Sequence, residues 1–245
     1  MVNKTKTFNY TAIGNGEPMI LLHGLFGDLS NWEAVKNYFE DDFRIIIPEL
    51  PIYEITSNNG IEELTVFLGN FLDHLGINEC ILVGNSLGGH VAISFALLNP
   101  LRVKKLILTG SSGLYENSFG GSYPKRGNYD YVKERIEATF YDPIIASQEL
   151  IDRVYEITKD NKRCFSIILT ARSAQKNNLG DQLHLLKMPV LLIWGKQDRI
   201  APPDVAEAFR EKIPNAELHW IDRCGHAPMM EHPTAFNKLL DQFLR

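Results

Sequence analysis

The chain has few cysteines and no long apolar run, and both shortages narrow what it is able to be. Its 3 cysteines lie far apart among 245 residues, which fits neither a disulfide framework nor a zinc site. The first seven residues are polar and lack the apolar core of a secretion signal. No apolar run approaches the length needed to cross a bilayer. These absences predict reduced thiols and a cytoplasmic protein.

An excess of positive charge is also missing. Lysine and arginine total 25 against 30 acidic residues, which gives a net charge of −5. Nucleic acids and anionic membranes attract basic surfaces, so neither is an expected partner. A small-molecule substrate is expected instead, and the composition leaves the oligomeric state unknown.

Short apolar runs alternate with amphipathic helical stretches along the chain. Runs that are apolar on both faces are typical of buried parallel strands, and they occur at residues 19–22, 44–47, 80–83, 103–108, 190–194 and 217–221. Helical periodicity occurs at residues 30–39, 61–75, 90–98, 203–212 and 233–244. This alternation predicts an α/β fold, with a mostly parallel twisted sheet flanked by helices. Residues 5–10 and the turn Gly14-Asn15-Gly16 predict a leading antiparallel hairpin.

The alternation stops between residues 111 and 187. A loop rich in glycine, serine and tyrosine covers residues 111–128, and helical patterns follow at 129–140, 147–158 and 162–175. An insertion after a core strand emerges at the carboxyl ends of the strands, where such sheets bind their ligands. We therefore expect a core of residues 1–110 and 188–245 and a helical lid, or cap, of residues 111–187. The alternative is a set of extra helices packed on the sheet.

The segment Gly84-Asn85-Ser86-Leu87-Gly88 places a serine between an apolar run and a helical stretch. A serine at such a sharp strand-to-helix turn is raised above the sheet at the positive end of a helix. Glycine on either side lets the strand and the helix approach closely. Ser86 is therefore the candidate nucleophile.

A serine hydroxyl needs a base to take its proton, and the base needs an acid to orient it. Asp198 follows the apolar run 190–194, and His226 follows the run 217–221. Both would lie at the carboxyl ends of strands, as Ser86 does. Asp222 and Asp28 are rival acids, ranked lower because the loop of Asp198 directly follows its strand.

Stabilisation of a negatively charged intermediate requires nearby N–H donors. One donor is expected to be the backbone N–H of Leu87, directly after the nucleophile. The other is expected in the segment His23-Gly24-Leu25-Phe26, after an early strand, at Leu25 with Phe26 as the next candidate.

These motifs, in the chain order Ser86, Asp198, His226, resemble those of the α/β-hydrolase superfamily. Gly-Asn-Ser-Leu-Gly-Gly and the C-terminal Cys-Gly-His are similar to small esterases and to meta-cleavage-product hydrolases, which break carbon–carbon bonds. Those carbon–carbon hydrolases commonly carry tryptophan after the catalytic histidine, where this chain has Ala227. The resemblance implies an α/β-hydrolase fold, a Ser86–His226–Asp198 triad and no metal or organic cofactor.

The sequence therefore favours a serine hydrolase that cleaves a small, partly apolar carboxylic ester through an acyl-enzyme. One alternative is a carbon–carbon bond hydrolase acting on a vinylogous diketone, and another is a small-molecule receptor on a hydrolase fold. Four candidate pocket residues accompany this prediction: Phe26, Phe119, Arg172 and Met229.

Overall fold

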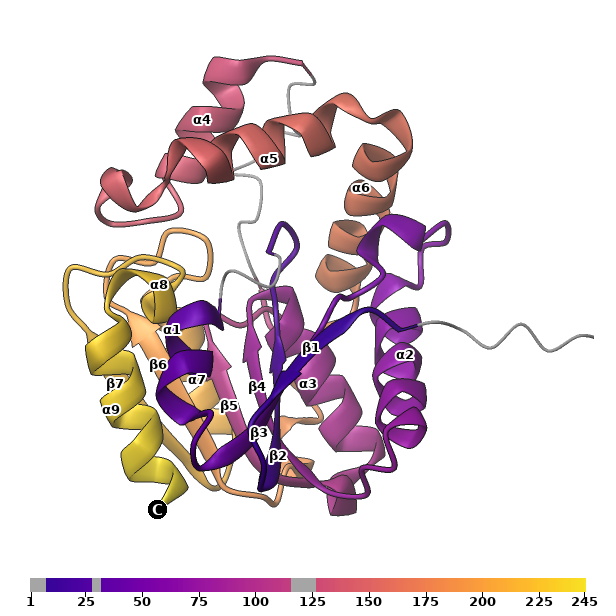
Figure 1. Cartoon of the computed structure of the whole chain (residues 1–245), viewed down its shortest axis with the longest axis vertical. Helices are drawn as coiled ribbons and strands as arrows, with labels where there is room; N and C mark the ends of the chain where they lie inside the picture. The colour runs from indigo at the N-terminus through magenta and orange to yellow at the C-terminus, as the bar shows by residue number, and fades with distance from the viewer. Residues whose placement is uncertain (1–7, 28–31, 116–126) are drawn as a thin grey trace, which may run out of the picture.

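The computed structural model describes residues 8–27, 32–115 and 127–245, and its centre is a single seven-stranded sheet (Figure 1). The strand order is β1-β3-β2-β4-β5-β6-β7. All neighbouring strands are parallel except β1, which runs antiparallel to β3. The predicted mostly parallel sheet is thus confirmed. The strands are β1 (Tyr10–Ile13), β2 (Glu17–Leu22), β3 (Phe43–Pro48), β4 (Cys80–Asn85), β5 (Val103–Thr109), β6 (Val190–Gly195) and β7 (Ala216–Ile221).

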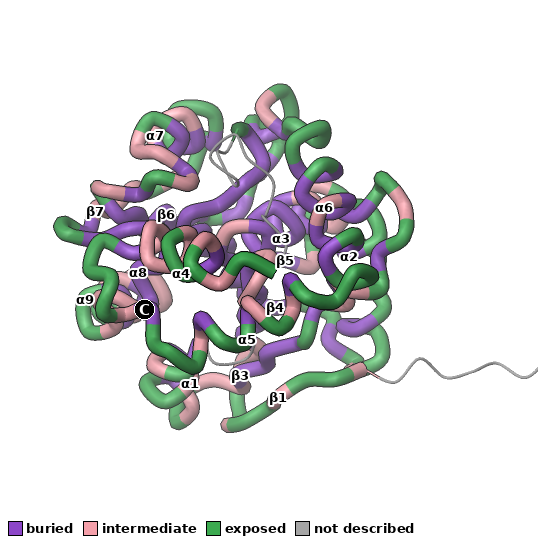
Figure 2. The backbone as a smooth tube through the Cα atoms, turned by 90° about the horizontal axis from the view of Figure 1, so that it is seen from above, coloured by how far each residue is buried: buried purple, intermediate pink, exposed green. Residues whose placement is uncertain are grey.

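Helices cover both faces of the sheet because successive strand residues point to opposite sides. On β2, Met19 and Leu21 enter one apolar cluster, while Ile20 and Leu22 enter the other. The first cluster packs against α1 (Glu33–Phe39) and α9 (Pro233–Leu244), and the second against α2 (Gly60–His74), α3 (Leu87–Leu98) and α7 (Pro203–Lys212). The strands β4 and β6 are buried along their whole length between these layers, whereas the edge strands β1 and β7 are largely exposed or half-buried (Figure 2).

The predicted leading hairpin is wrong, because β1 and β2 do not pair. β3 lies between them, and Tyr10 of β1 faces Pro48 of β3. The turn that follows β1 packs on the start of β3: a side chain at Gly16 would meet the carbonyl oxygen of Asp42 at 2.7 Å. The chain thus turns against the start of β3, and β2 then pairs with the other edge of β3, between β3 and β4.

Three helices lie above one end of the sheet in Figure 1, between β5 and β6 in the chain. They are α4 (Tyr129–Glu137), α5 (Gln148–Lys159) and α6 (Asn161–Lys176), and all three helical patterns of the sequence are therefore confirmed. Asn128, Ser147 and Asp160 cap them, each accepting a backbone N–H with its side chain. That residues 111–187 act as a lid stays a prediction.

The two ends of this insertion meet in a narrow neck. The N–H of Leu179 donates to the carbonyl oxygen of Gly113 at 2.8 Å, and the Asn178 side chain donates to the carbonyl oxygen of Leu114 at 2.6 Å. The chain therefore enters and leaves the insertion at nearly one point.

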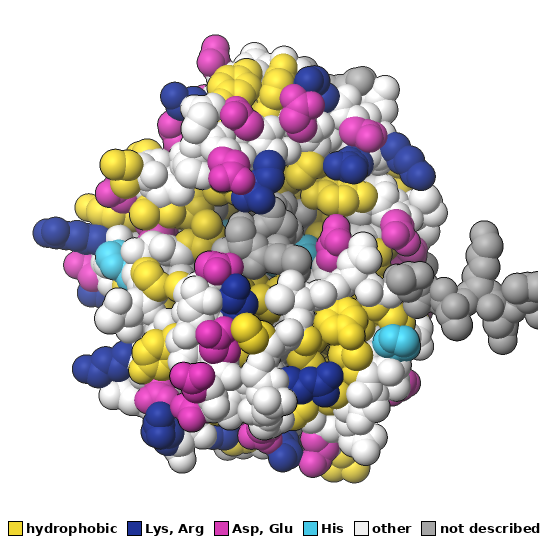
Figure 3. Space-filling view, viewed as in Figure 1, with side chains coloured by type: hydrophobic (Ala, Val, Ile, Leu, Met, Phe, Trp, Pro, Cys, Tyr) yellow, Lys and Arg dark blue, Asp and Glu magenta, His cyan; other side chains and the backbone are white. Residues whose placement is uncertain are grey.

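The remaining short helices join these elements. They are η2 (Ile52–Glu54), η3 (Pro100–Arg102), η4 (Pro143–Ile145), η5 (Leu183–Leu185) and α8 (Pro228–Glu231). Within the described ranges, every helix is too short or too polar to cross a membrane. Acidic and basic side chains are interspersed over the face seen in Figure 3. All three cysteines are free and buried.

Candidate active site

Ser86 occupies a strained turn between β4 and α3. Its φ of 54° and ψ of −119° lie outside the usual regions for a non-glycine residue, which costs about 1–3 kcal/mol. Glycine is required beside it, since a side chain at Gly84 would lie 2.6 Å from the backbone of Gly88 and Gly89. The N–H of Ser86 donates to the Thr109 carbonyl oxygen on β5 at 3.1 Å. The sheet thus holds the serine at its carboxyl end.

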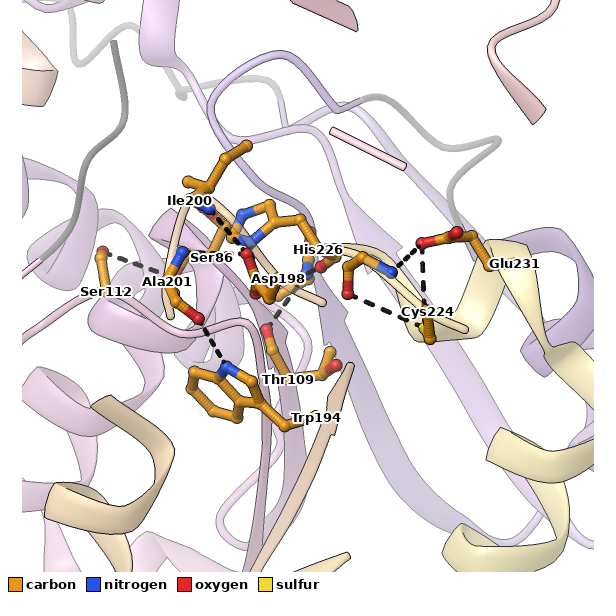
Figure 4. Close-up of polar contacts among 12 residues, drawn as sticks. Ser86, Thr109, Ser112, Trp194, Asp198, Ile200, Ala201, Cys224, His226 and Glu231 are labelled. Atoms are coloured by element: carbon orange, nitrogen blue, oxygen red, sulfur yellow. Dashed lines mark hydrogen bonds and ion pairs between the residues drawn. The ribbon is translucent and has the colours of Figure 1, made fainter. Parts of the chain in front are cut away.

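Asp198 and His226 form a buried hydrogen-bonded pair at the same end of the sheet (Figure 4). Asp198 Oδ2 lies 2.9 Å from His226 Nδ1, and Asp198 Oδ1 accepts the N–H groups of Ile200 and Ala201 at 2.8 and 2.9 Å. A carboxylate held in this way accepts a hydrogen bond from the Nδ1–H group of the histidine. The neutral ring then carries its proton on Nδ1, and Nε2 keeps its lone pair. The histidine is thereby prepared to accept a proton at Nε2.

The rival acids do not take this place. Asp222 is exposed and bonds to Gln197 at 3.3 Å and to Lys196 at 3.8 Å. Asp28 lies outside the described residues.

Ser86 and His226 line one cavity of about 410 Å³ between the sheet and the helical insertion. Its described walls are mostly apolar, with Val132, Ile136 and Phe140 from the insertion side and Ala227 and Met230 from the core. The volume suits a small organic molecule.

Leu25 and Leu87, the two residues predicted to supply oxyanion donors, lie at this cavity. Leu25 lies in the turn from Gly24 to Gly27, whose ends are joined by a 3.1 Å backbone hydrogen bond, and Leu87 begins α3. Both residues line the cavity, and within the described part of the chain neither N–H has a hydrogen-bond acceptor. The free N–H of a first helical residue is available to an anion.

His23 holds the Leu25 turn in place. Its Nδ1 donates to the carbonyl oxygen of Gly24 at 2.8 Å, and its Nε2 accepts the N–H of Leu50 at 3.1 Å. The ring therefore ties the loop after β2 to the loop after β3.

His90 is a fully buried histidine one turn beyond Ser86. Its Nε2 lies 3.3 Å from Asn177 Oδ1, and its Nδ1 lies 3.3 Å from Ser112 Oγ. Ser112 lies at the start of the insertion and Asn177 follows α6, so the ring bridges both ends of the neck. Burial lowers the pKa of His90 from 6.5 to about 4, and the ring is neutral at ordinary pH.

The predicted pocket residues have different outcomes. Phe26 lines the cavity, whereas Phe119 lies outside the described residues. Arg172 is exposed on α6 and does not line the cavity, because Ala171 and Ala174 present that face of the helix. The assignment of Arg172 is therefore corrected.

Met229 also requires a correction. It is buried in the core cluster beneath α8, and the cavity is lined instead by its neighbour Met230. One residue along a helix turns the side chain by about 100°, which separates these two positions.

The sequence analysis missed two arginines in the cavity wall, Arg135 on α4 and Arg199 after Asp198. Arg135 is half-buried, and no acidic side chain among the described residues pairs with it. The described lining of the cavity contains no aspartate or glutamate. A usable signal was present, since Tyr131, Arg135 and Thr139 follow each other at helical spacing and all line the cavity.

Asn85, beside the serine, was also missed. Its side-chain amide donates to the Thr109 and His226 carbonyl oxygens, both at 3.1 Å. Among the described residues no group of three or more potential ligands is placed to hold a metal ion.

This fold and site place the chain in a known family. The family model described as alpha/beta hydrolase fold matches residues 17–233, so the chain belongs to the alpha/beta hydrolases. An alpha/beta hydrolase enzyme from a metagenome of lagoon sediments at Mar Chica, Morocco, is 37% identical, with a TM-score of 0.79 over 99% of this chain and 96% of that one.

Other relatives carry more specific names. The chain is 33% identical to a 2-hydroxy-6-oxononadienedioate/2-hydroxy-6-oxononatrienedioate hydrolase of Burkholderia vietnamiensis, over 97% of this chain and 90% of the relative. It is 30% identical to a 2-hydroxy-6-oxo-6-phenylhexa-2,4-dienoate hydrolase of Burkholderia cepacia, over 94% of this chain and 88% of that one. These names favour the carbon–carbon alternative over the ester that the sequence analysis preferred.

Proposed function

We propose that this protein is a serine hydrolase that cleaves the carbon–carbon bond beside a ketone in an unsaturated keto acid. The observation that carries the proposal is the cavity itself. It joins Ser86 and His226 to an apolar wall that contains two arginines and, among the described residues, no acid. The names of the relatives support the same reaction.

The first step uses the groups around Ser86. His226 Nε2 takes the proton of the serine hydroxyl as the oxygen bonds to the ketone carbon. The ketone oxygen becomes negative and is stabilised by the N–H groups of Leu25 and Leu87. Asp198 keeps the imidazole oriented and balances the positive charge that forms on it.

The second step breaks the bond between the ketone carbon and its neighbour. Carbon is a poor leaving group, and in the dienoates named for the relatives the carbon beside the ketone belongs to a double bond, so the 2-hydroxyl proton must first move to that carbon. The electron pair of the breaking bond then enters the conjugated 2-oxo-enoate that this shift creates. His226 then returns its proton to the enolate oxygen of the departing fragment. Water hydrolyses the ester formed on Ser86, and the sum is the addition of one water molecule to give two acids.

The two arginines support an acidic substrate. Arg135 and Arg199 add positive charge to a cavity that is otherwise apolar, and the described lining offers no carboxylate to neutralise them. A guanidinium binds a carboxylate through paired, charge-assisted hydrogen bonds. A substrate carboxylate would satisfy this unpaired charge, whereas a neutral ester would not.

Ester hydrolysis is the second candidate, favoured by Ala227. Ala227 lines the cavity, and it stands at the position where the carbon–carbon hydrolases that the chain resembles commonly carry tryptophan. The same serine, base and oxyanion donors would cleave an ester, and an alkoxide leaves without conjugation.

Turnover of matched substrates tests these proposals. The purified protein would be assayed with 2-hydroxy-6-oxo-6-phenylhexa-2,4-dienoate, with 2-hydroxy-6-oxononadienedioate, and with p-nitrophenyl esters from acetate to palmitate. We expect kcat/KM on a dienoate to exceed that on every ester, with Ser86→Ala as the inactive control. Faster cleavage of an ester would establish the second candidate. Binding without turnover of any substrate would indicate a receptor.

A further inference from the structure

The carboxylate of Glu231 joins the loop of His226 to the helical insertion. Its Oε1 accepts the N–H of Gly225 at 2.7 Å, and its Oε2 accepts the N–H of Tyr141 at 2.7 Å. Gly225 directly precedes His226, and Tyr141 follows α4. Figure 4 shows Glu231 directed from α8 toward this loop, beside Cys224.

The two loops also contact each other directly. The N–H of His226 donates to the Thr139 carbonyl oxygen at 2.9 Å. A side chain at Gly225 would lie 2.6 Å from that same oxygen, so only glycine permits this approach. The carbonyl oxygen of His226 accepts the Asn85 amide from the serine side at 3.1 Å. The main chain of the histidine is therefore held from both sides.

The segment that holds His226 is also part of the substrate wall. Thr139 and Phe140 line the cavity, and both lie in the stretch bonded to the histidine loop. A molecule that displaces Thr139 or Phe140 would therefore also displace the residues that hydrogen-bond to the His226 loop.

The chemistry of the contact requires a carboxylate. Each carboxylate oxygen of Glu231 accepts a backbone N–H from a different loop, so both terminal atoms of the side chain must be hydrogen-bond acceptors. Glutamine offers one acceptor and would turn an N–H₂ group toward the other N–H. Half-burial raises the pKa of the Glu231 carboxyl, while the N–H donors around it act in the opposite direction.

We infer that Glu231 is a positioning residue that fixes His226 against residues 139–141, the stretch that carries Thr139 and Phe140 of the cavity wall, so that this wall and the base move as one unit. This inference rests on the proposed role of His226 as the base. Glu231 does not touch the cavity, because its oxygens are occupied by the two loops.

The test measures the rate at which a fluorophosphonate labels Ser86 in the full-length protein. This reaction needs the serine and its base and is independent of which substrate is natural. We expect Glu231→Gln to slow labelling about 10- to 100-fold, since small displacements of a catalytic group have effects of this size. Turnover of the best dienoate should show the same loss in kcat with KM nearly unchanged.

The matched control is Glu207→Gln, at a partly exposed glutamate on α7 that pairs with Arg210 at 2.9 Å. It should label at the wild-type rate. Circular dichroism would confirm that both variants are folded at the assay temperature. If Glu231→Gln is unstable there, the downfield proton signal of His226 Nδ1–H is compared at a lower temperature and should move.

The outcomes separate the two proposals. Wild-type labelling of Glu231→Gln, with an unmoved His226 proton signal, would overturn the positioning role alone. A wild-type protein that no fluorophosphonate labels would overturn the proposed function and this inference with it. Labelling that is slowed in Glu231→Gln, with esters cleaved faster than any dienoate, would support the positioning role and reject carbon–carbon cleavage.

Discussion

Mild acid should weaken the fold through His90. The folded protein excludes a proton from this buried ring until the pH approaches its pKa of about 4, whereas the unfolded chain binds one near 6.5. Between these values unfolding takes up a proton, so the stability from neutral His90 is present above pH 6.5 and is lost as the pH falls toward 4.

The size of the effect follows from the two pKa values. A fall from 6.5 to about 4 corresponds to about 3 kcal/mol, because each tenfold change in proton affinity is worth about 1.4 kcal/mol. Lowering the pH from 7 to 5 should remove about 2 kcal/mol of this contribution. That is a large share of the stability of an ordinary domain.

Urea unfolding at both pH values measures the loss. His90→Gln is the informative variant, since its amide N–H₂ keeps a donor for Asn177 and does not titrate. Every other titrating group is common to the two proteins, so the difference between their pH dependences isolates His90. The same loss of stability in both proteins would refute a neutral, buried His90 as its source.

The other predictions concern the site. Ser86→Ala should lower kcat by at least about three orders of magnitude, and Asp198→Asn should leave the circular dichroism spectrum unchanged but abolish most activity. Full activity of either variant would remove that residue from the mechanism. Arg135→Leu should raise KM for an acidic substrate about 10- to 100-fold, because a charge-assisted hydrogen bond is worth about 1.5–3 kcal/mol. Arg172→Leu is its control, and equal effects of the two would reject the arginine wall. Gly88→Ala should lower the free energy of unfolding by at least about 2 kcal/mol in urea titration, since its side chain would meet the Leu22 carbonyl; wild-type stability would contradict the close packing at the elbow.

The sheet and its helices were predictable because their signal is local. A run such as residues 190–194 is apolar on both faces, and only burial between two layers accounts for that. The place of β1 was not predictable in this way. Its turn residues suit a hairpin, and pairing with β3 depends on a backbone contact made by a distant segment.

In the candidate site, too, the features with a local sequence signal were predictable and those set by distant contacts were not. Ser86, Asp198 and His226 each follow a strand, so the sheet brings them to one end, and their spacing in the chain is enough to find them. The cavity wall depends on how each helix is rotated about its axis. That rotation places Arg135 in the wall and turns Arg172 to solvent. It is set by packing between helices, which cannot be read from the sequence of one helix alone.

The neck at Gly113 and Leu179 has a consequence for how such a protein diversifies. Because the insertion enters and leaves at nearly one point, its replacement disturbs one junction and leaves the seven-stranded sheet intact. Evolution is then free to exchange the substrate wall as a module while the reactive groups of the core are inherited unchanged. The hydrogen bonds that join residues 139–141 to His226 and Glu231 limit this freedom, since a replacement insertion would have to form them again.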